Sequence, residues 1–259
     1  MEFLTSAKDS SPSLQVMKFK LGRLPVRHDP RTLKLKEYLT TLPPLPAAVD
    51  WGSNVKNWQM LGNDSVGDCT CAGAGHAIET WTANASQEFG PTTNQILEAY
   101  SAITGYNAND PSTDQGANMI DVLNYWRKVG IAGHQITAYT SVNWYKQTEI
   151  MASVYLFGGC YIGVNLPQSA EEAFSNGEPW TDTSDTNILG GHCVLIVGYD
   201  SGGLWICTWG RLVYASWAWL NAYTEEAYAV YSRPDWVEAT GNCPPGFNDQ
   251  ALESDLAMI

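Results

Sequence analysis

Hydrophobic residues in the first half of the chain recur with the three-to-four-residue period of an α-helix. This spacing predicts helices over residues 68–85, 92–104 and 119–130. The pattern is clearest in the third segment, where Ile120, Leu123 and Trp126 form one stripe and Gly130 ends the helix. Thr92 or Thr93 is placed to cap the second helix. The first half of the chain is therefore predicted to be helical.

The second half of the chain changes to short runs of β-branched and aromatic residues. These runs are separated by glycine-rich turns and predict antiparallel strands over residues 159–166, 190–200, 204–210 and 226–232. Helices followed by strands predict an α+β fold with two lobes. The domain boundaries are predicted as an N-terminal extension (1–43), one folded domain (44–240) and a C-terminal tail (241–259).

Composition and charge restrict the partners of this protein. The chain has 259 residues, of which 44% are hydrophobic and 16% charged, so it can bury a large core. Its formal net charge of −13 disfavours binding to nucleic acid or to anionic membranes. The N-terminal residues do not form the apolar stretch of a signal peptide, and no run is long enough to span a membrane. The expected location is the cytoplasm or the interior of an assembly.

The cysteines predict neither a disulfide framework nor a metal site. The chain has six cysteines: Cys69, Cys71, Cys160, Cys193, Cys207 and Cys243. In a cytoplasmic protein most cysteines pack as small hydrophobic residues. No CxxC or HExxH spacing is present, so we expect no zinc and no other cofactor. Because residues two positions apart on a helix point in different directions, Cys71 is expected to face the core if Cys69 faces a cleft.

Cys69 is the candidate nucleophile. It follows Gly67 and Asp68 at the predicted start of a helix, where the helix dipole and the unpaired amides favour a thiolate. Asn63 and the backbone N–H of Cys69 are candidate donors to an oxyanion. The same residues are also compatible with a structural thiol that begins a helix.

His192 is the candidate base. His76 lies two helical turns beyond Cys69, roughly 10 Å away, which is too far for direct proton transfer. His28 lies in the extension and His134 in a predicted turn, whereas His192 opens an apolar strand after two glycines. We expect the Cys69 sulfur within about 4 Å of a His192 ring nitrogen.

Three blocks of sequence together resemble the papain-like cysteine peptidases. These blocks are "AAVDW" with "NDSVGDC" near the start, "HCVLIVGYD" from residue 192, and "CTWG" at 207–210. They occur in the family's order, and Cys69 and His192 are separated by slightly fewer residues than the roughly 130–150 typical of papain-type enzymes. The resemblance covers about residues 44–235. It implies a two-lobed papain-like fold, with Gly67 beside the nucleophile and Gly116 on the wall of the substrate cleft.

The match also implies how this chain departs from the family. Cys207 occupies the position of the asparagine that orients the imidazole, and we expect it close to His192 on a neighbouring strand. Trp209 is the tryptophan of the same block. The oxyanion glutamine is shortened to Asn63, and the extension is shorter than the family's inhibitory propeptide. This chain is thus a divergent member whose triad asparagine is replaced.

Three functions follow from these residues. The first is a weak cysteine peptidase or amidase that forms an acyl-thioester on Cys69 and acts on a peptide or protein substrate. The second is a catalytically impaired papain-fold protein with a binding or structural role, such as a subunit of a virion or another assembly, with a protein partner. The third is a related acyl-transfer enzyme. Retention of Cys69 and His192 favours an enzyme, and loss of the asparagine favours the second alternative.

Overall fold

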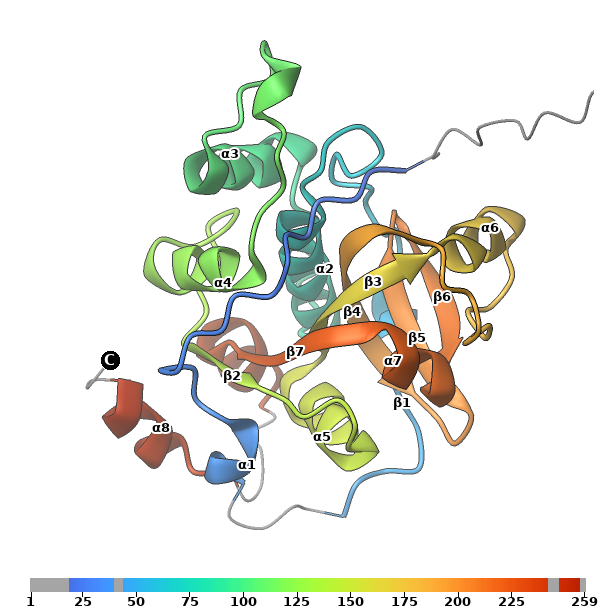
Figure 1. Cartoon of the computed structure of the whole chain (residues 1–259). Coiled ribbons are helices and arrows are strands. Elements are labelled where there is room, and N and C mark those ends of the chain that lie inside the picture. The colour runs from blue at the N-terminus through green and yellow to red at the C-terminus, as the bar shows by residue number, and fades with distance from the viewer. Residues whose placement is uncertain (1–18, 40–43, 242–246, 257–259) are drawn as a thin grey trace, which may run out of the picture.

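The computed structural model describes residues 19–39, 44–241 and 247–256 (Figure 1). Its helices are α1 (Leu35–Tyr38), α2 (Cys69–Asn84), α3 (Thr93–Thr104), α4 (Met119–Lys128), α5 (Gln147–Phe157), α6 (Gln168–Asn176), α7 (Trp217–Tyr223) and α8 (Asp249–Leu256). Short helical turns are η1 (Gly52–Asn54), η2 (Pro111–Thr113) and η3 (Arg233–Glu238). Its strands are β1 (Val49–Asp50), β2 (Ala138–Ser141), β3 (Cys160–Pro167), β4 (Ile188–Tyr199), β5 (Gly203–Thr208), β6 (Arg211–Ser216) and β7 (Thr224–Tyr231).

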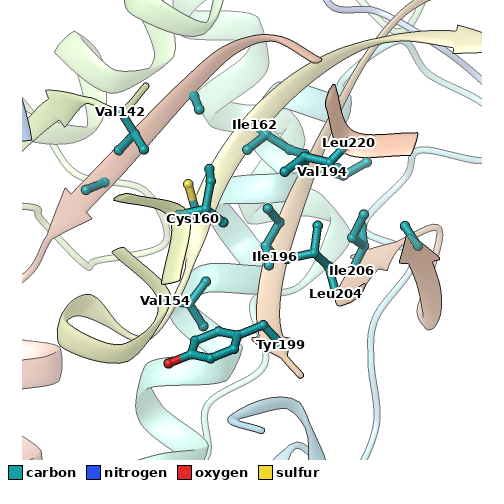
Figure 2. Packing of buried hydrophobic residues seen from close by; sticks show 14 of the residues in the cluster. Val142, Val154, Cys160, Ile162, Val194, Ile196, Tyr199, Leu204, Ile206 and Leu220 are labelled. Atoms are coloured by element: carbon teal, nitrogen blue, oxygen red, sulfur yellow. The ribbon is translucent and has the colours of Figure 1, made fainter. Parts of the chain in front are cut away.

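The strands form one antiparallel sheet. Six of them follow the order β2-β7-β3-β4-β5-β6, and β1 pairs with β4. Helices α2, α3 and α4 come before this sheet in the chain, apart from the short β1, so the predicted α+β class is confirmed. Alternation along β4 separates two cores, because Val194 and Ile196 join one hydrophobic cluster while Cys193 and Leu195 join the other. Figure 2 shows the first cluster, where Leu220 and Val154 pack near these strands.

The three predicted helices form close to their expected bounds. Thr92 caps α3 and forms a capping box with Gln95, which satisfies two otherwise unpaired amides. Helices α5, α6 and α7 lack a sequence-based prediction. The α5 segment is largely apolar and carries no clear helical stripe, so its burial rather than its periodicity decides its structure.

Helix α2 is buried on almost every side. A side chain at Gly73 would meet the Tyr161 ring of β3 at 2.9 Å, and one at Gly75 would meet Leu61 at 2.5 Å. The two glycines thus allow close packing with the sheet and with the loop before the helix. The candidate nucleophile therefore begins an element that the rest of the molecule holds rigidly.

The described parts of the predicted extension and tail pack into the same core as the domain between them. Leu35, Tyr38 and Leu252 are buried in the first cluster, and the Tyr38 hydroxyl donates to Asp255 at 2.7 Å. Cys243 lies outside the described residues. Among the helices that the structure describes, none has the length and apolar character to cross a membrane.

Three tryptophans bind the C-terminal end of α5 to the rest of the molecule. The last carbonyls of a helix lack partners within it. Here the indole N–H groups of Trp51, Trp81 and Trp236 donate to the carbonyls of Val154, Phe157 and Leu156, each at 2.8 Å. Trp81 belongs to α2, so this set of hydrogen bonds ties α2, the helix that begins with Cys69, to α5.

Replacing Trp81 with Phe is expected to lower the free energy of unfolding by about 1–3 kcal/mol. The substitution keeps an aromatic ring but leaves the buried carbonyl of Phe157 without its donor. Urea unfolding monitored by circular dichroism measures the change. Trp205→Phe, at a partly exposed position of β5, is the matched control and should cost less. Equal loss in the two variants would contradict this role for Trp81.

Candidate active site

Cys69 is the first residue of α2 and is 1% exposed. Burial raises the pKa of its thiol to about 12. Backbone hydrogen bonds from Cys193 and Gly22 oppose this shift by favouring the thiolate, while the neighbouring Asp68 raises the pKa further. Since Cys193 directly follows His192 on β4, the fold brings the predicted nucleophile beside the strand that carries the predicted base.

His192 is fully buried on β4 and holds a defined ring orientation. Its Nε2 lies 2.7 Å from the Thr208 hydroxyl oxygen, and its ring stacks on Trp209 with centroids 4.4 Å apart. Its Nδ1 has no hydrogen-bond partner among the described residues. Burial, followed by the charges of His76 and Arg23, lowers the pKa of the imidazole to about 3. The ring is therefore neutral.

The residue that contacts the imidazole is Thr208, and this corrects the expectation for Cys207. Alternation along β5 puts Cys207 into the core cluster shared with α2, whereas Ile206 joins the opposite cluster. Thr208 therefore shares the face of the sheet on which His192 lies. The face of the strand decides which residue reaches the ring. The alternation of side-chain faces from Ile206 to Thr208 is the sequence signal that could have identified Thr208 as the partner of the imidazole.

An N-terminal segment lies directly across this site. We call residues 19–24 the strap; Figure 1 shows its extended course in front of α2. The Arg23 amide donates to the Gly191 carbonyl at 3.0 Å, and the Ala117 amide donates to the Gly22 carbonyl at 2.8 Å. The Leu24 amide donates to the Ala117 carbonyl at 3.0 Å. These are the backbone contacts of an added strand, and the sequence alone did not predict them.

Glycines make room for the strap. A side chain at Gly116 would come within 2.3 Å of the Gly22 carbonyl oxygen, and one at Gly191 within 2.2 Å of the Arg23 carbonyl oxygen. At Gly67 it would meet the Leu21 carbonyl oxygen at 2.9 Å. Gly67 and Gly116, both singled out from the sequence, thus border one channel that is wide enough for a polypeptide backbone.

A hydrogen-bonded pair of buried Tyr100 and half-buried Asp114 fixes two of these glycines. The Asp114 carboxylate accepts from the Gly67 amide at 3.0 Å and from the Tyr100 hydroxyl at 2.8 Å. The Tyr100 hydroxyl in turn accepts from the Gly116 amide at 2.8 Å. The loop before the nucleophile and the opposite wall of the channel are therefore held by one hydrogen-bonded network.

Asn63 lies beside the channel, with its side-chain amide engaged locally. Its Nδ2 donates to the Val66 carbonyl at 3.1 Å. The backbone carbonyl of Asn63 accepts from the Lys20 amide at 3.2 Å. Burial raises the pKa of the Asp68 carboxyl well above its usual value. To serve an oxyanion, the Asn63 amide would have to turn from the Val66 carbonyl toward a substrate.

Other titratable groups lie outside the channel. His76 Nε2 contacts the Gln59 carbonyl at 2.9 Å, and its ring packs against Trp58. Cys71 is fully buried in the core. The described cysteines are free thiols, and no cluster of three or more His, Cys, Asp or Glu residues in the described ranges is arranged to hold a metal ion.

Three cysteine proteases of known structure are similar to this chain. Xylellain from Xylella fastidiosa is 18% identical, with 83% of this chain and 97% of that chain covered and a TM-score of 0.63. Procathepsin L 3 from the Tenebrio molitor larval midgut is 18% identical, with 78% and 76% covered and a TM-score of 0.52. The proform of the ragweed pollen allergen Amb a 11 is 14% identical, with 75% and 67% covered and a TM-score of 0.53.

No protein-family model and no curated protein matches the chain. The structural likeness confirms the papain-like fold that the sequence resemblance implied. At these identities it establishes the fold, and the chemistry has to be argued from the residues of this chain.

Thr208→Val is expected to lower the free energy of unfolding by about 1–3 kcal/mol, because it leaves the buried Nε2 of His192 unpaired. Thr208→Ser keeps the hydroxyl and is the matched control. Urea unfolding of both variants gives the comparison. A valine variant as stable as the serine variant would show that the hydroxyl does not pair with the ring.

Alkylation of Cys69 by iodoacetamide is expected to accelerate steadily between pH 6 and 9.5 without levelling off. The thiolate is the reactive form, and burial has raised the pKa of this thiol to about 12. Peptide mapping by mass spectrometry measures the rate at each pH. In the urea-unfolded chain, the control, the rate should be half-maximal near pH 8.5 (about the ordinary pKa of a thiol) and level off above it. A plateau below pH 9 in the folded chain would contradict the assigned shift.

Proposed function

We propose that this protein is a cysteine peptidase or amidase that the strap holds in a closed, latent state. Cys69 is the nucleophile and His192 the base. The observation that carries the proposal is the strap itself, an extended backbone hydrogen-bonded to Gly191 and Ala117 and packed over the thiol. A groove that holds one extended polypeptide beside a cysteine and a histidine can hold another.

The reaction follows from the arrangement of these groups. His192 takes the thiol proton on Nδ1, and the Cys69 sulfur attacks the carbonyl carbon of the substrate. The backbone N–H of Cys69 and the amide of Asn63 stabilise the oxyanion. His192 then gives the proton to the departing amine, which leaves an acyl-thioester. Water, deprotonated by the same imidazole, hydrolyses the thioester and restores the thiol.

Thr208 replaces an amide as the partner of the imidazole. A hydroxyl can both donate and accept, so it fixes the ring tautomer less firmly than an amide oxygen does. Loss of the tautomer-fixing partner costs about 10⁴ in rate in a related triad. Slow turnover is therefore part of the proposal.

Latency follows from burial. With the strap in place, the Cys69 thiol has a pKa of about 12 and the His192 imidazole a pKa of about 3, so both groups stay neutral. Burial is the largest cause of both shifts. Release of the strap admits water, brings both pKa values toward their ordinary range and opens the channel to substrate.

One alternative has specific support. A closed channel, two neutral groups and a hydroxyl in place of an amide also suit a papain-fold protein that binds a partner or builds an assembly without catalysis. The two functions differ in what happens once the strap is displaced. Only the enzyme should then hydrolyse a peptide.

Gly22→Ala is expected to displace the strap and activate the protein. The new methyl group would lie 1.7 Å from the Gly67 carbonyl oxygen, a backbone atom that cannot yield. Alkylation of Cys69 should accelerate at least about tenfold, equivalent to ~1.4 kcal/mol in the opening equilibrium. Hydrolysis of a fluorogenic peptide library should become measurable and should disappear in Gly22→Ala/Cys69→Ala.

Gly90→Ala is the control, because its methyl group makes only ordinary contacts at 3.8 Å and lies away from the strap. Circular dichroism establishes that each variant is folded. Fast, selective alkylation of Cys69 in Gly22→Ala with no hydrolysis of any library member would reject the peptidase and favour the binding or structural protein.

A further inference from the structure

The strap places one charged side chain in the interior of the protein. The Arg23 side chain is 1% exposed, and its guanidinium spans two carboxylates, with Nη2 2.7 Å from Glu225 and Nη1 3.2 Å from Glu226. Nη2 also donates to the Asn165 side chain at 2.9 Å and to the Val164 carbonyl at 3.3 Å. Nη1 also donates to the Leu24 carbonyl of the strap at 3.3 Å. The other four acceptors belong to strands β3 and β7, so the sheet builds most of the pocket.

An irregularity in β7 brings the two carboxylates together. Gly163 pairs with Glu226 but Val164 pairs with Thr224, so Glu225 is an extra residue on its strand. In a regular strand, adjacent side chains point to opposite faces, and the extra residue lets both glutamates address one group. The Tyr228 hydroxyl donates to Glu226 at 2.8 Å and holds this carboxylate in place.

The wall of the pocket is shaped for a long side chain. A side chain at Gly163 would come within 2.6 Å of Arg23 Cδ and 2.7 Å of Met119 Sδ. Glycine at this position of β3 therefore leaves the space that the arginine stem fills. The stem reaches the carboxylates between the sheet and α4, which supplies Met119.

The pocket also lies next to the candidate nucleophile. Gly22, the residue before Arg23, contacts Gly67 and hydrogen-bonds to the Cys69 thiol through its backbone. A polypeptide that runs along the channel thus places one side chain in this pocket when its adjoining backbone lies over Cys69. A group bound there is held within a residue or two of the reacting bond.

We propose that this pocket selects arginine in the substrate, so that the protein acts on peptides with an arginine within two residues of the bond to be cleaved. Arg23 occupies the pocket in the latent state as a surrogate for that arginine. Two carboxylates, an amide oxygen and a backbone carbonyl match the several N–H donors of a guanidinium better than the single ammonium group of lysine. The net charge of −13 favours the approach of cationic peptides. This inference rests on the proposed function for its substrate, but the pocket can be tested without catalysis.

The test uses the full chain carrying Cys69→Ala and Arg23→Ala, with n-propylguanidinium as the probe in isothermal titration calorimetry. Saturable binding is expected to this variant and not to the chain that retains Arg23. Adding Glu226→Gln should weaken the binding at least tenfold. Glu88→Gln, which removes a carboxylate paired with exposed Lys56, should leave it unchanged. The probe n-propylammonium has the same charge without the planar fork and should bind at least tenfold more weakly.

Absence of saturable binding to the folded Arg23→Ala variant would overturn the proposal, as would equal affinity for the two probes. If that variant does not fold, the same titration is followed by circular dichroism, and n-propylguanidinium but not n-propylammonium must restore the folded state. Failure of this rescue also overturns it.

The substrate is tested separately in Gly22→Ala, with peptides that carry arginine or the neutral isostere citrulline. Faster hydrolysis of the arginine peptide supports the proposal, and equal rates oppose it. Binding of the guanidinium probe without hydrolysis of any peptide would support the arginine pocket but contradict the proposed peptidase function.

Discussion

A guanidinium withdrawn from water has to be paired with carboxylates, and in this chain that pairing determines where the N-terminal segment lies. Arg23 is joined to Glu225 and Glu226 across more than two hundred residues of sequence. Of the two pairs, Arg23–Glu226 is buried. Removing one partner of a buried ion pair costs about 3–5 kcal/mol, because the other charge is left uncompensated. The strap is therefore anchored at one side chain, and its backbone contacts with Gly191 and Ala117 follow from that anchor.

The anchor controls the chemistry of the site through solvent access. Cys69 begins a helix and accepts hydrogen bonds from Cys193 and Gly22, all of which favour a thiolate. Burial outweighs these effects, and the pKa of the thiol rises to about 12. The same burial lowers the pKa of His192 to about 3. A thiolate–imidazolium pair of Cys69 and His192 thus requires water to enter the site. Because Arg23 holds the strap in place, it controls the protonation of both groups indirectly, through their burial.

The sequence predicted the helices whose formation depends on the spacing of neighbouring hydrophobic and capping residues. The helical stripe of Ile120, Leu123 and Trp126 and the cap at Thr92 predict their helices because neighbouring residues decide them. The order of the blocks around Cys69 and His192 predicted the papain-like fold. The partner of the imidazole was assigned wrongly, since the face of β5 selects Thr208. The strap over the site was not predicted, because it depends on a pairing between distant residues.

In the proposed mechanism, competition for one pocket links latency to substrate recognition. If the strap and a substrate arginine use the same carboxylates, binding of one excludes the other, and the coupling is reciprocal. A covalently attached segment acts at an effective concentration in the millimolar range, so a free peptide competes poorly unless it makes further contacts. Its apparent affinity equals the intrinsic affinity multiplied by the fraction of molecules in which the strap is released. Gly163 and the extra residue Glu225 therefore define both how firmly the protein is closed and which side chain can open it.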